Sequence, residues 1–414
     1  MRIPCTRISA SFDCINTPKG LIDKAVKLGL SGIAITDHEC LSALPEANAY
    51  GLELRKEYPD FKVALGDEVY LTDTRDKGIY YYHCILIAKD SVGFKMLRET
   101  SSKAWLNSYF DRGMERVPTL RSELENVIKK YGKGHLIMSS ACLASRLSRL
   151  ILKLIEEEKK PNNHDNIIAV KRQIDEFMKW CIEWFGDDFY CEVAPGKSPE
   201  QVAVNKRCAQ IARAYGQKVV IGTDAHYLNK EDRYVHKAFL TSKQAERETD
   251  SFYQYSYLQS EEELRENLAP SELDYNELVR NSEDMYNKIE IYDIAHPQQI
   301  PKVEIPDYPK RQERLDGAHP ILSSLFSSDN KSERYWINEC FKGFKEKKID
   351  PMAHTEYLDE LEKEADIKRT VGHRLDTCIF DYPITLKHYI DMIWENGSTI
   401  GAGRGSAGAG LNHW

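Results

Sequence analysis

The first half of the chain alternates between segments of helical periodicity and short apolar runs that end in polar residues. The pattern is clearest after Thr17-Pro18, because threonine caps helices well and proline suits the first helical turn. Leu21–Leu28 has helical spacing, and Gly29 can close that helix in a left-handed conformation. The β-type run Gly32–Ile35 follows and ends at Thr36-Asp37-His38. This order predicts a helix and then a buried strand.

Further apolar runs predict strands that also lie next to polar residues: Val63–Leu65, Tyr81–Ala88, Leu136–Met138, Phe189–Cys191 and Val219–Ile221. Helical segments such as Gln201–Tyr215 separate several of them. This alternation predicts an α/β fold, either a parallel barrel or a doubly wound sheet. In a barrel, side chains at the carboxyl ends of the strands converge on one face. The residues at such ends are Asp37, His38, Glu68, Cys142, Glu192, Asp224 and His226, whereas His83 precedes most of its apolar run.

The second half has a different organisation. Residues 241–290 are polar and largely helical in pattern, and His296–Tyr308 is proline-rich, which is typical of an extended linker. Ser323–Lys331 predicts a polar loop, and helical patterns resume after it. The helices that we expect are Ser260–Leu268, Tyr275–Ile289, Tyr357–Arg369 and Leu386–Asn396. We therefore predict divisions of the chain at 1–240, 241–290, 291–331 and 332–414.

Composition agrees with an ordinary globular protein of 414 residues, which is long enough for two or more domains. The ten cysteines include no CxxC pair or zinc-finger spacing, so we expect reduced thiols in a cytoplasmic protein. Neither a signal peptide nor a membrane-spanning run is evident. The net charge of −8 argues mildly against nucleic-acid binding, although an acidic body can still carry a local basic groove.

Imidazole, carboxylate and thiol groups at successive strand ends suit a divalent metal site. Each of these residues also has a simpler explanation. His38 alone could be a hydrogen-bonded structural residue, Cys142 a buried thiol, and Asp224 a helix cap. Their joint position at successive strand ends favours a metal site of zinc-like or manganese-like character.

These strand ends also resemble a known family. The motifs Ala34–His38, Gly66–Tyr70, Tyr81–His83, Ser140–Ala144 and Thr223–Leu228 look like successive motifs of the PHP (polymerase and histidinol phosphatase) domain. They are most similar to the PHP domain of the bacterial DNA polymerase III alpha subunit, rather than to stand-alone PHP phosphatases. The resemblance implies a PHP-type distorted (β/α) barrel with nine ligand positions for up to three metal ions. Six of those positions match here: His38, Glu68, His83, Cys142, Asp224 and His226.

The first motif departs from the family pattern, which is His-x-His followed by a serine and then an aspartate. When the serine is aligned on Ser11, Cys5 and Arg7 stand where the two histidines belong. Cys14 falls on the aspartate position, although the neighbouring Asp13 could serve if the loop shifts. Arg7 is a permanent cation and cannot ligate a metal.

We therefore expect the ion held jointly by this motif, Glu68 and Asp224 to be absent, with Arg7 close to one of these carboxylates. A smaller site remains open, built on His38, His83, Cys142 and His226. Complete sites in the family are associated with 3′–5′ exonuclease or phosphoesterase activity through metal-activated water. With a central position lost, we expect a structural PHP domain that braces a polymerase, and an active phosphoesterase or exonuclease is the alternative.

A glycine-rich stretch after the strand-like Thr399-Ile400 could form a phosphate cradle, because glycines let backbone N–H groups approach an anion. By itself it is equally consistent with a flexible turn, and it lacks the Walker A pattern. The segment Tyr389–Gly410, however, resembles the palm of the alpha subunit, where a Gly-Arg-Gly-Ser loop binds the triphosphate of the incoming nucleotide. The resemblance gives that role to Gly403, Arg404, Gly405 and Ser406.

Taken over nearly the whole chain, the resemblance implies the N-terminal portion of a replicative DNA-directed DNA polymerase. The predicted divisions then become a PHP barrel (1–240), its helical extension (241–290), a Pro/Ser-rich linker (291–331) and the first part of an α+β palm (332–414). The catalytic aspartates of the family lie further downstream, so we expect no catalytic polymerase residue here and no polymerase activity from this chain alone.

The full-length protein is expected to act on primed template DNA with deoxynucleoside triphosphates, alongside replisome subunits and without a membrane. Zinc or manganese is the expected PHP metal, and magnesium is expected at the polymerase site. We expect a cytoplasmic location, in a bacterium or in a cell infected by a bacteriophage. Two other classes stay open: an independent metal-dependent phosphoesterase, and a non-catalytic interaction module.

Overall fold

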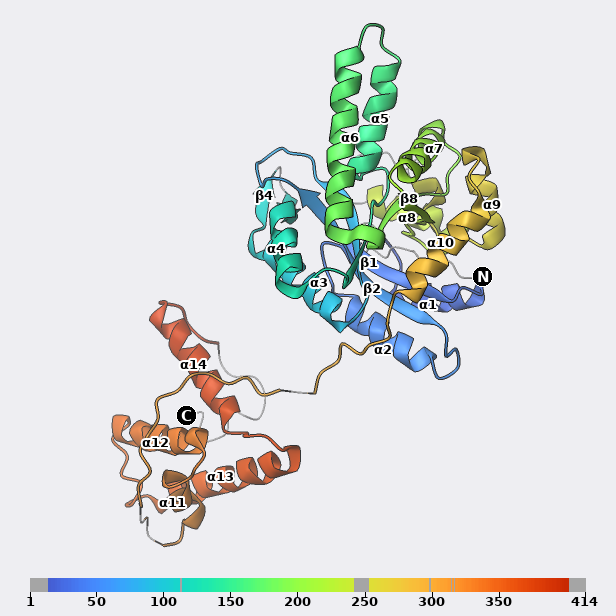
Figure 1. Ribbon diagram of the computed structural model, residues 1–414. Coiled ribbons are helices and arrows are strands. Elements are labelled where there is room, and N and C mark those ends of the chain that lie inside the picture. The colour runs from blue at the N-terminus through green and yellow to red at the C-terminus, as the bar shows by residue number, and fades with distance from the viewer. Residues whose placement is uncertain are drawn as a thin grey trace. The chain divides into compact units, whose positions relative to one another are not determined.

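The computed structural model describes residues 14–111, 114–241, 253–297, 299–313, 315 and 317–401. The chain divides into two compact units, Met1–Ala295 and His296–Trp414, and each is described by itself (Figure 1). Cys5 and Arg7 of the first motif lie outside the described residues, as do all four residues of the predicted triphosphate loop, Gly403 to Ser406. Within the described residues, no helix is both long enough and apolar enough to cross a bilayer.

The first unit is built on a seven-stranded sheet with the strand order β1-β2-β3-β7-β8-β9, and β6 pairs with β2 off this path. Its strands are β1 (Gly32–His38), β2 (Lys62–Thr72), β3 (Tyr82–Ala88), β6 (Pro118–Leu120), β7 (Leu136–Ser139), β8 (Phe189–Val193) and β9 (Lys218–Ile221). A separate two-stranded ribbon consists of β4 (Tyr109–Asp111) and β5 (Met114–Arg116). The mixed α/β fold that the sequence predicts is confirmed.

One strand runs against the prediction of a parallel barrel. The pairs β1–β2, β2–β6, β7–β8 and β8–β9 are parallel, but β3 is antiparallel to both β2 and β7. The start of β3 therefore lies at the edge where β1 and β2 end. This reversal explains the position of His83, which comes at the beginning of its apolar run and still reaches the same edge as His38.

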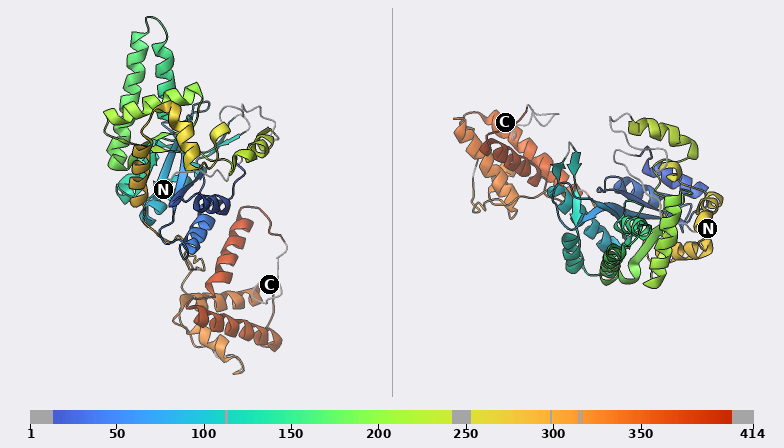
Figure 2. Two further views of the ribbon diagram at one scale, coloured as in Figure 1. Left: turned by 90° about the vertical axis from the view of Figure 1, so that its right-hand side faces the viewer. Right: turned by 90° about the horizontal axis from the view of Figure 1, so that it is seen from above.

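Most helices surround one face of this sheet, and α10 packs against the other face through Met285 (Figures 1 and 2). The α-helices of the first unit are α1 (Pro18–Lys27), α2 (Leu44–Leu54), α3 (Ser91–Leu106), α4 (Arg121–Tyr131), α5 (Arg146–Glu158), α6 (His164–Phe185), α7 (Pro199–Ala214), α8 (Arg233–Thr241), α9 (Glu261–Leu268) and α10 (Tyr275–Asn287). Helices α5 and α6 lie side by side as an antiparallel hairpin. Short 3₁₀ turns cover Gly186–Asp188, Lys230–Asp232, Tyr253–Tyr255 and Ala269–Ser271.

The two faces of the sheet bury different side chains, because successive residues of a strand point to opposite sides. Leu65 and Leu86 belong to the large core beneath the helices, whereas Ala34, Ile85 and Tyr190 form a smaller cluster on the other face. The residues Glu68 and His83 share the parity of this smaller cluster in their strands. The inner face therefore carries both apolar residues and the candidate metal ligands.

Local sequence signals set the helix starts. The Thr17 side chain accepts a hydrogen bond from the Gly20 amide at 3.1 Å, and Pro18 begins α1, as predicted. Gly29 follows the helix with φ of 71°, a conformation that glycine adopts readily. Ser260 caps α9 in a capping box with Glu263, which a polar helical pattern alone did not specify.

The second unit is helical in its described part, with α11 (Pro320–Phe326), α12 (Lys331–Glu346), α13 (Thr355–Leu375) and α14 (Asp381–Glu395). Its core gathers apolar residues such as Trp336, Leu361 and Phe380. The polar loop predicted at Ser323–Lys331 is wrong over its first residues, because α11 extends to Phe326. The helix extends into this serine-rich stretch because Leu322, Leu325 and Phe326 have helical spacing and are fully buried. Residues 399–400, predicted to be strand-like, are not in a strand.

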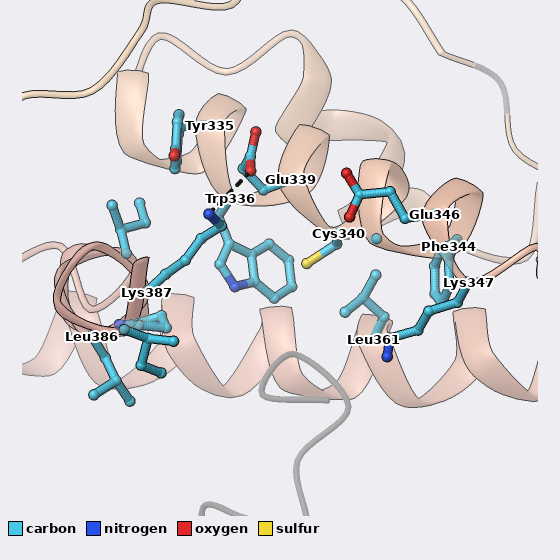
Figure 3. Close-up of a pocket in the computed structure, with 14 residues that line it drawn as sticks. Tyr335, Trp336, Glu339, Cys340, Phe344, Glu346, Lys347, Leu361, Leu386 and Lys387 are labelled. Carbon is cyan, nitrogen blue, oxygen red and sulfur yellow. Dashed lines mark ion pairs between the residues drawn. The ribbon is translucent and has the colours of Figure 1, made fainter. Parts of the chain in front are cut away.

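A cavity of about 410 Å³ lies among α12, α13 and α14 of this unit (Figure 3). Trp336, Cys340 and Leu361 form an apolar floor, and Glu339 and Lys387 form an ion pair at its edge. None of the predicted metal ligands lines it. It therefore has no part in the metal site described next.

Candidate metal centre

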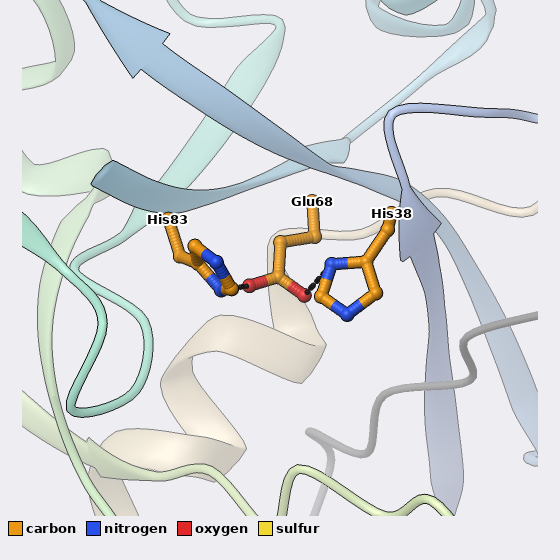
Figure 4. Close-up of side chains that lie close together, drawn as sticks. All are labelled: His38, Glu68 and His83. Atoms are coloured by element: carbon orange, nitrogen blue, oxygen red, sulfur yellow. Dashed lines mark ion pairs between the residues drawn. The ribbon is translucent and has the colours of Figure 1, made fainter. Parts of the chain in front are cut away.

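Three of the predicted ligands meet at one edge of the sheet. The Glu68 carboxylate lies between two imidazoles, with Oε2 2.9 Å from His38 Nδ1 and Oε1 2.6 Å from His83 Nδ1 (Figure 4). One ligand atom from each residue lies within 4.8 Å of the others. The Glu68 side chain is fully buried, and the His38 side chain nearly so. The sequence therefore places two nitrogen donors and one oxygen donor around a common point.

The register of the sheet explains this meeting. In the parallel pair β1–β2, His38 is the direct partner of Glu68, and in the antiparallel pair β2–β3, Tyr70 is the direct partner of His83. Residues two apart on one strand share a face, so Glu68 and Tyr70 point to the same side. A slip of one residue in either pair would send one of the two histidines to the face opposite Glu68.

The electrostatics of the group favour a positive charge. Burial alone would lower the pKa of His83, but the Glu68 carboxylate and hydrogen bonds to Cys142 and Glu68 raise it to about 9. His83 is therefore protonated at neutral pH in the absence of a metal. The same negative groups that stabilise this proton, above all the Glu68 carboxylate, would also attract a metal ion.

The other three matching positions lie next to this group. Cys142, in the loop after β7, has its Sγ 3.8 Å from His83 Nδ1. The His226 ring, which follows β9, is centred 6.3 Å from the His38 ring. Asp224 Oδ1 is 3.5 Å from His226 Nδ1, and Cys142 and Asp224 line the same small cavity. The structure thus brings all six predicted residues into one region, and three of them into ligand distance of each other.

The backbone around these residues is strained. Seven described residues other than glycine have positive φ, and three of them belong to this region: Glu39, Ala141 and Asp224. Glu39 follows His38, and Ala141 precedes Cys142. Left-handed conformations of residues with a Cβ cost energy and often mark functional sites. The main chain therefore bends where it presents each of these side chains.

The first motif is only partly described. Cys14 is half-buried against the core. The residues that follow it are anchored near the site, because the Ile15 amide donates to the His226 carbonyl at 3.1 Å and the Asn16 side chain donates to the Ala225 carbonyl at 3.1 Å. The predicted approach of Arg7 to a site carboxylate lies outside the described residues and stays a prediction.

Several residues around the site were not singled out by sequence reasoning. The Tyr70 ring stacks on the His83 ring with centroids 4.9 Å apart. His236 and Tyr253 pack against the His226 ring, at 5.7 and 4.9 Å between centroids. The position of Tyr70 two residues after Glu68 was a usable signal. His236 and Tyr253 come from segments whose packing no local pattern reveals. Glu192 is the second-last residue of β8, and its carboxylate accepts a hydrogen bond from the Ser139 hydroxyl.

The donor set fits a zinc-like ion. Zinc binds imidazole nitrogen, carboxylate oxygen and thiolate sulfur, and it prefers four ligands in a compact shell. His38, Glu68 and His83 supply three such donors within 4.8 Å of one another, and the Cys142 thiol adjoins His83. The residues present can therefore hold one ion.

Comparison with known proteins agrees with this geometry. Residues 6–195 match the family described as the PHP domain. The chain is 34% identical over 419 residues to a Bacillus subtilis protein named "Probable DNA polymerase YorL" and, with the same figures, to a DNA-directed DNA polymerase of Bacillus phage SPbeta. These alignments cover 96% of this chain and 32% of each relative. The DNA polymerase III subunit alpha of Aquifex aeolicus is 26% identical over 418 residues, covering 94% of this chain and 31% of that protein.

The chain thus spans about a third of the length of the curated relatives that it matches. The family match includes the strands that carry His38, Glu68 and His83 and the loop that carries Cys142. Residues 6–195 therefore match the PHP domain, and nearly the whole chain is homologous to the N-terminal region of these DNA polymerases, among them a DNA polymerase III subunit alpha.

Proposed function

We propose that this chain is the N-terminal portion of a replicative DNA-directed DNA polymerase. The observation that carries the proposal is the 34% identity over 96% of the chain to two polymerases, which extends beyond the PHP domain into the second unit. In the longer protein, primed template DNA and deoxynucleoside triphosphates would be the substrates. Arg404 and the neighbouring Gly403, Gly405 and Ser406 would contact the triphosphate, because an Arg and backbone N–H groups suit a polyanion.

The test is primer extension by the full-length gene product. We expect the longer protein to incorporate nucleotides and the chain ending at Trp414 to incorporate none. Arg404→Ala in the longer protein should raise KM for the nucleotide by about tenfold or more, since a charge-assisted hydrogen bond contributes about 1.5–3 kcal/mol. Arg374→Ala, an exposed arginine of α13, is the matched control and should leave KM unchanged. A longer protein that incorporates no nucleotide on a primed template would refute the proposal.

For the PHP domain itself we propose a reduced, structural metal site. Among the described residues, only His38, Glu68 and His83 bring three possible ligand atoms within 4.8 Å of one another. A phosphodiesterase of this type needs ions that activate a water and stabilise charge on the phosphorus oxygens. Arg7 and Cys5 at the positions of the family's two histidines oppose that chemistry.

The residues of the site would have separate roles in binding the ion and in orienting its ligands. His38, His83 and Glu68 would hold the ion, with Cys142 as the adjoining fourth donor. A bound zinc ion would supply a strong cross-link between strands β1, β2 and β3. Tyr70 stacks on His83 and limits its rotation, and the hydrogen bond between His226 Nδ1 and the Asp224 carbonyl at 2.8 Å fixes the orientation of the His226 ring.

Removing the metal should destabilise the first unit. Binding to the folded state alone contributes about 4 kcal/mol when free zinc exceeds Kd by about a thousandfold. We expect a chelator to lower the melting temperature of the first unit by several degrees, and zinc to restore it. The variant His38→Ala should melt at the same temperature with and without chelator. Differential scanning calorimetry provides the measurement.

An exonuclease assay on the same protein distinguishes a structural metal site from an active phosphoesterase or exonuclease. We expect no 3′–5′ exonuclease activity with zinc or manganese above the level of the His38→Ala variant. Exonuclease activity that this substitution removes, in a protein whose melting is unaffected by chelator, would instead establish the phosphoesterase alternative.

Zinc affinity should depend on pH through His83. A protonated imidazole cannot ligate a metal, and the pKa of His83 is about 9 in the metal-free protein. Zinc must therefore displace this proton, and a thiol donor also releases a proton on binding zinc, so the apparent affinity should rise at least about tenfold per pH unit between pH 6 and 8. The dependence should level off above pH 9. Competition titrations with a chromophoric chelator measure it, and a flat profile would show that His83 is not a ligand.

A further inference from the structure

Glu39, the residue directly after His38, is buried and conformationally strained. Its side chain and backbone are 3% exposed, and its φ is 52°. Glycine and asparagine are the residues that usually occupy this left-handed region, because a Cβ is unfavourable there. A glutamate at such a position keeps its place only when the surrounding contacts compensate for the strain.

Each polar group of Glu39 has a partner. Its amide donates to the Glu68 carbonyl at 2.9 Å, and its carbonyl accepts from Trp105 Nε1 at 2.6 Å. One carboxylate oxygen accepts from the Tyr70 amide, and the other lies 3.5 Å from Thr119 Oγ1. Glu39 therefore bonds twice to the backbone of β2, at the carbonyl of Glu68 and at the amide of Tyr70 two residues later.

This arrangement links the strained turn to the metal group. The bonds to the backbone of β2 fix the position of Glu68 along its strand relative to His38. The hydrogen bond from Trp105 connects the turn to the end of α3. Tyr70, held by the Glu39 carboxylate, is also the residue that stacks on His83. The Glu39 main chain thus bonds to the Glu68 carbonyl, and its carboxylate bonds to the amide of Tyr70, the direct partner of His83.

We propose that Glu39 is a positioning residue of the metal centre, which holds Glu68 and Tyr70 so that His38 and His83 converge on one ion. Glu39 is not itself a ligand, because among the described residues the group within 4.8 Å consists of His38, Glu68 and His83. The inference rests on the metal site proposed above. It adds a residue whose contribution is geometric.

Three substitutions separate strain from contact. Glu39→Gly removes both the backbone strain and the carboxylate, so it should fold well and still lose the Tyr70 and Thr119 contacts. Glu39→Gln keeps the length of the side chain and an oxygen acceptor for the Tyr70 amide, so it is a close mimic of the geometry. Glu272→Gly is the matched control, since Glu272 is an exposed glutamate with φ of 55°.

The first readout is zinc affinity, together with the absorption spectrum of the cobalt-substituted protein. Loss of a supporting residue around a metal typically weakens binding by about 10–100-fold, and we expect this of Glu39→Gly. Glu39→Gln should stay within about threefold of the parent, and Glu272→Gly should equal it. A changed cobalt spectrum in Glu39→Gly alone would support a role in geometry. Parent-like affinity and an unchanged spectrum in Glu39→Gly would overturn the proposal, as would equal losses in the Gln and Gly variants.

A second readout does not require metal. The imidazole resonances of His38 and His83 report their orientation in the zinc-free protein, and they should shift in Glu39→Gly but not in Glu272→Gly. If the parent protein binds no zinc, the proposed metal function fails, and these resonances still decide whether Glu39 positions the histidines. Unchanged resonances in Glu39→Gly would then refute the positioning role.

Discussion

Replacing Glu68 by alanine is expected to weaken zinc binding by about two to four orders of magnitude. The carboxylate is fully buried and contacts both imidazoles, at 2.9 and 2.6 Å. Removing one partner of a buried ionic group costs about 3–5 kcal/mol, and about 1.4 kcal/mol corresponds to a tenfold change in affinity. Glu68→Gln should show a loss of similar size, because the amide keeps the volume but lacks the charge. Zinc competition titrations measure the change.

Two controls make the Glu68 result specific. Glu53→Ala removes an exposed carboxylate from α2 and should leave zinc affinity unchanged. Circular dichroism and the imidazole resonances of the zinc-free Glu68→Gln variant establish whether it folds. A folded Glu68→Gln protein that binds zinc as tightly as the parent would show that the ion is held elsewhere.

Gly93→Ala should destabilise the first unit by about 3 kcal/mol. Gly93 lies in the first turn of α3, and a Cβ there would stand 2.2 Å from the carbonyl oxygen of His135 and 3.1 Å from the Cα of Ala88. Both are backbone atoms, so neither can rotate away. An alanine in a helix normally stabilises by about 0.5–1 kcal/mol relative to glycine, but overpacking of this kind costs about 1–3 kcal/mol or more. Denaturant unfolding, followed unit by unit with hydrogen exchange, measures the difference.

Gly343→Ala provides the opposite expectation. Gly343 lies in α12, and a Cβ there meets nothing within 4 Å. The substitution should therefore stabilise its helix by about 0.5–1 kcal/mol. If Gly93→Ala were as stable as the parent, α3 would have to shift away from the strand β7 that follows His135, and the close approach would not be a requirement of the fold.

The sequence predicted the element types well because the signals for them are local. Thr17-Pro18 and Gly29 each act within one helical turn, and the apolar strands were evident as short runs. The direction of β3 could not be predicted in the same way, because a short apolar run looks the same in a parallel and an antiparallel strand. His83 looked misplaced for this reason alone.

The sequence predicted that the candidate residues lie near one another, but it did not predict their geometry. All six matching residues lie in one region, yet only the pairing register shows that His38 stands opposite Glu68 and that Tyr70 stands opposite His83. The roles of Glu39 and His236 depend on contacts with residues far away in the sequence, such as Trp105 and Tyr253. No spacing rule carries that information.

The antiparallel β2–β3 pair also has a kinetic consequence. Glu68 and His83 belong to consecutive strands joined by residues 73–81, so they can meet through one short loop closure. His38 must instead be delivered by a parallel crossover that includes α2, which is a slower search. We expect Glu68 and His83 to come together early in folding. Zinc bound to this pair would then favour the pairing of β1 with β2, which brings His38 to the ion.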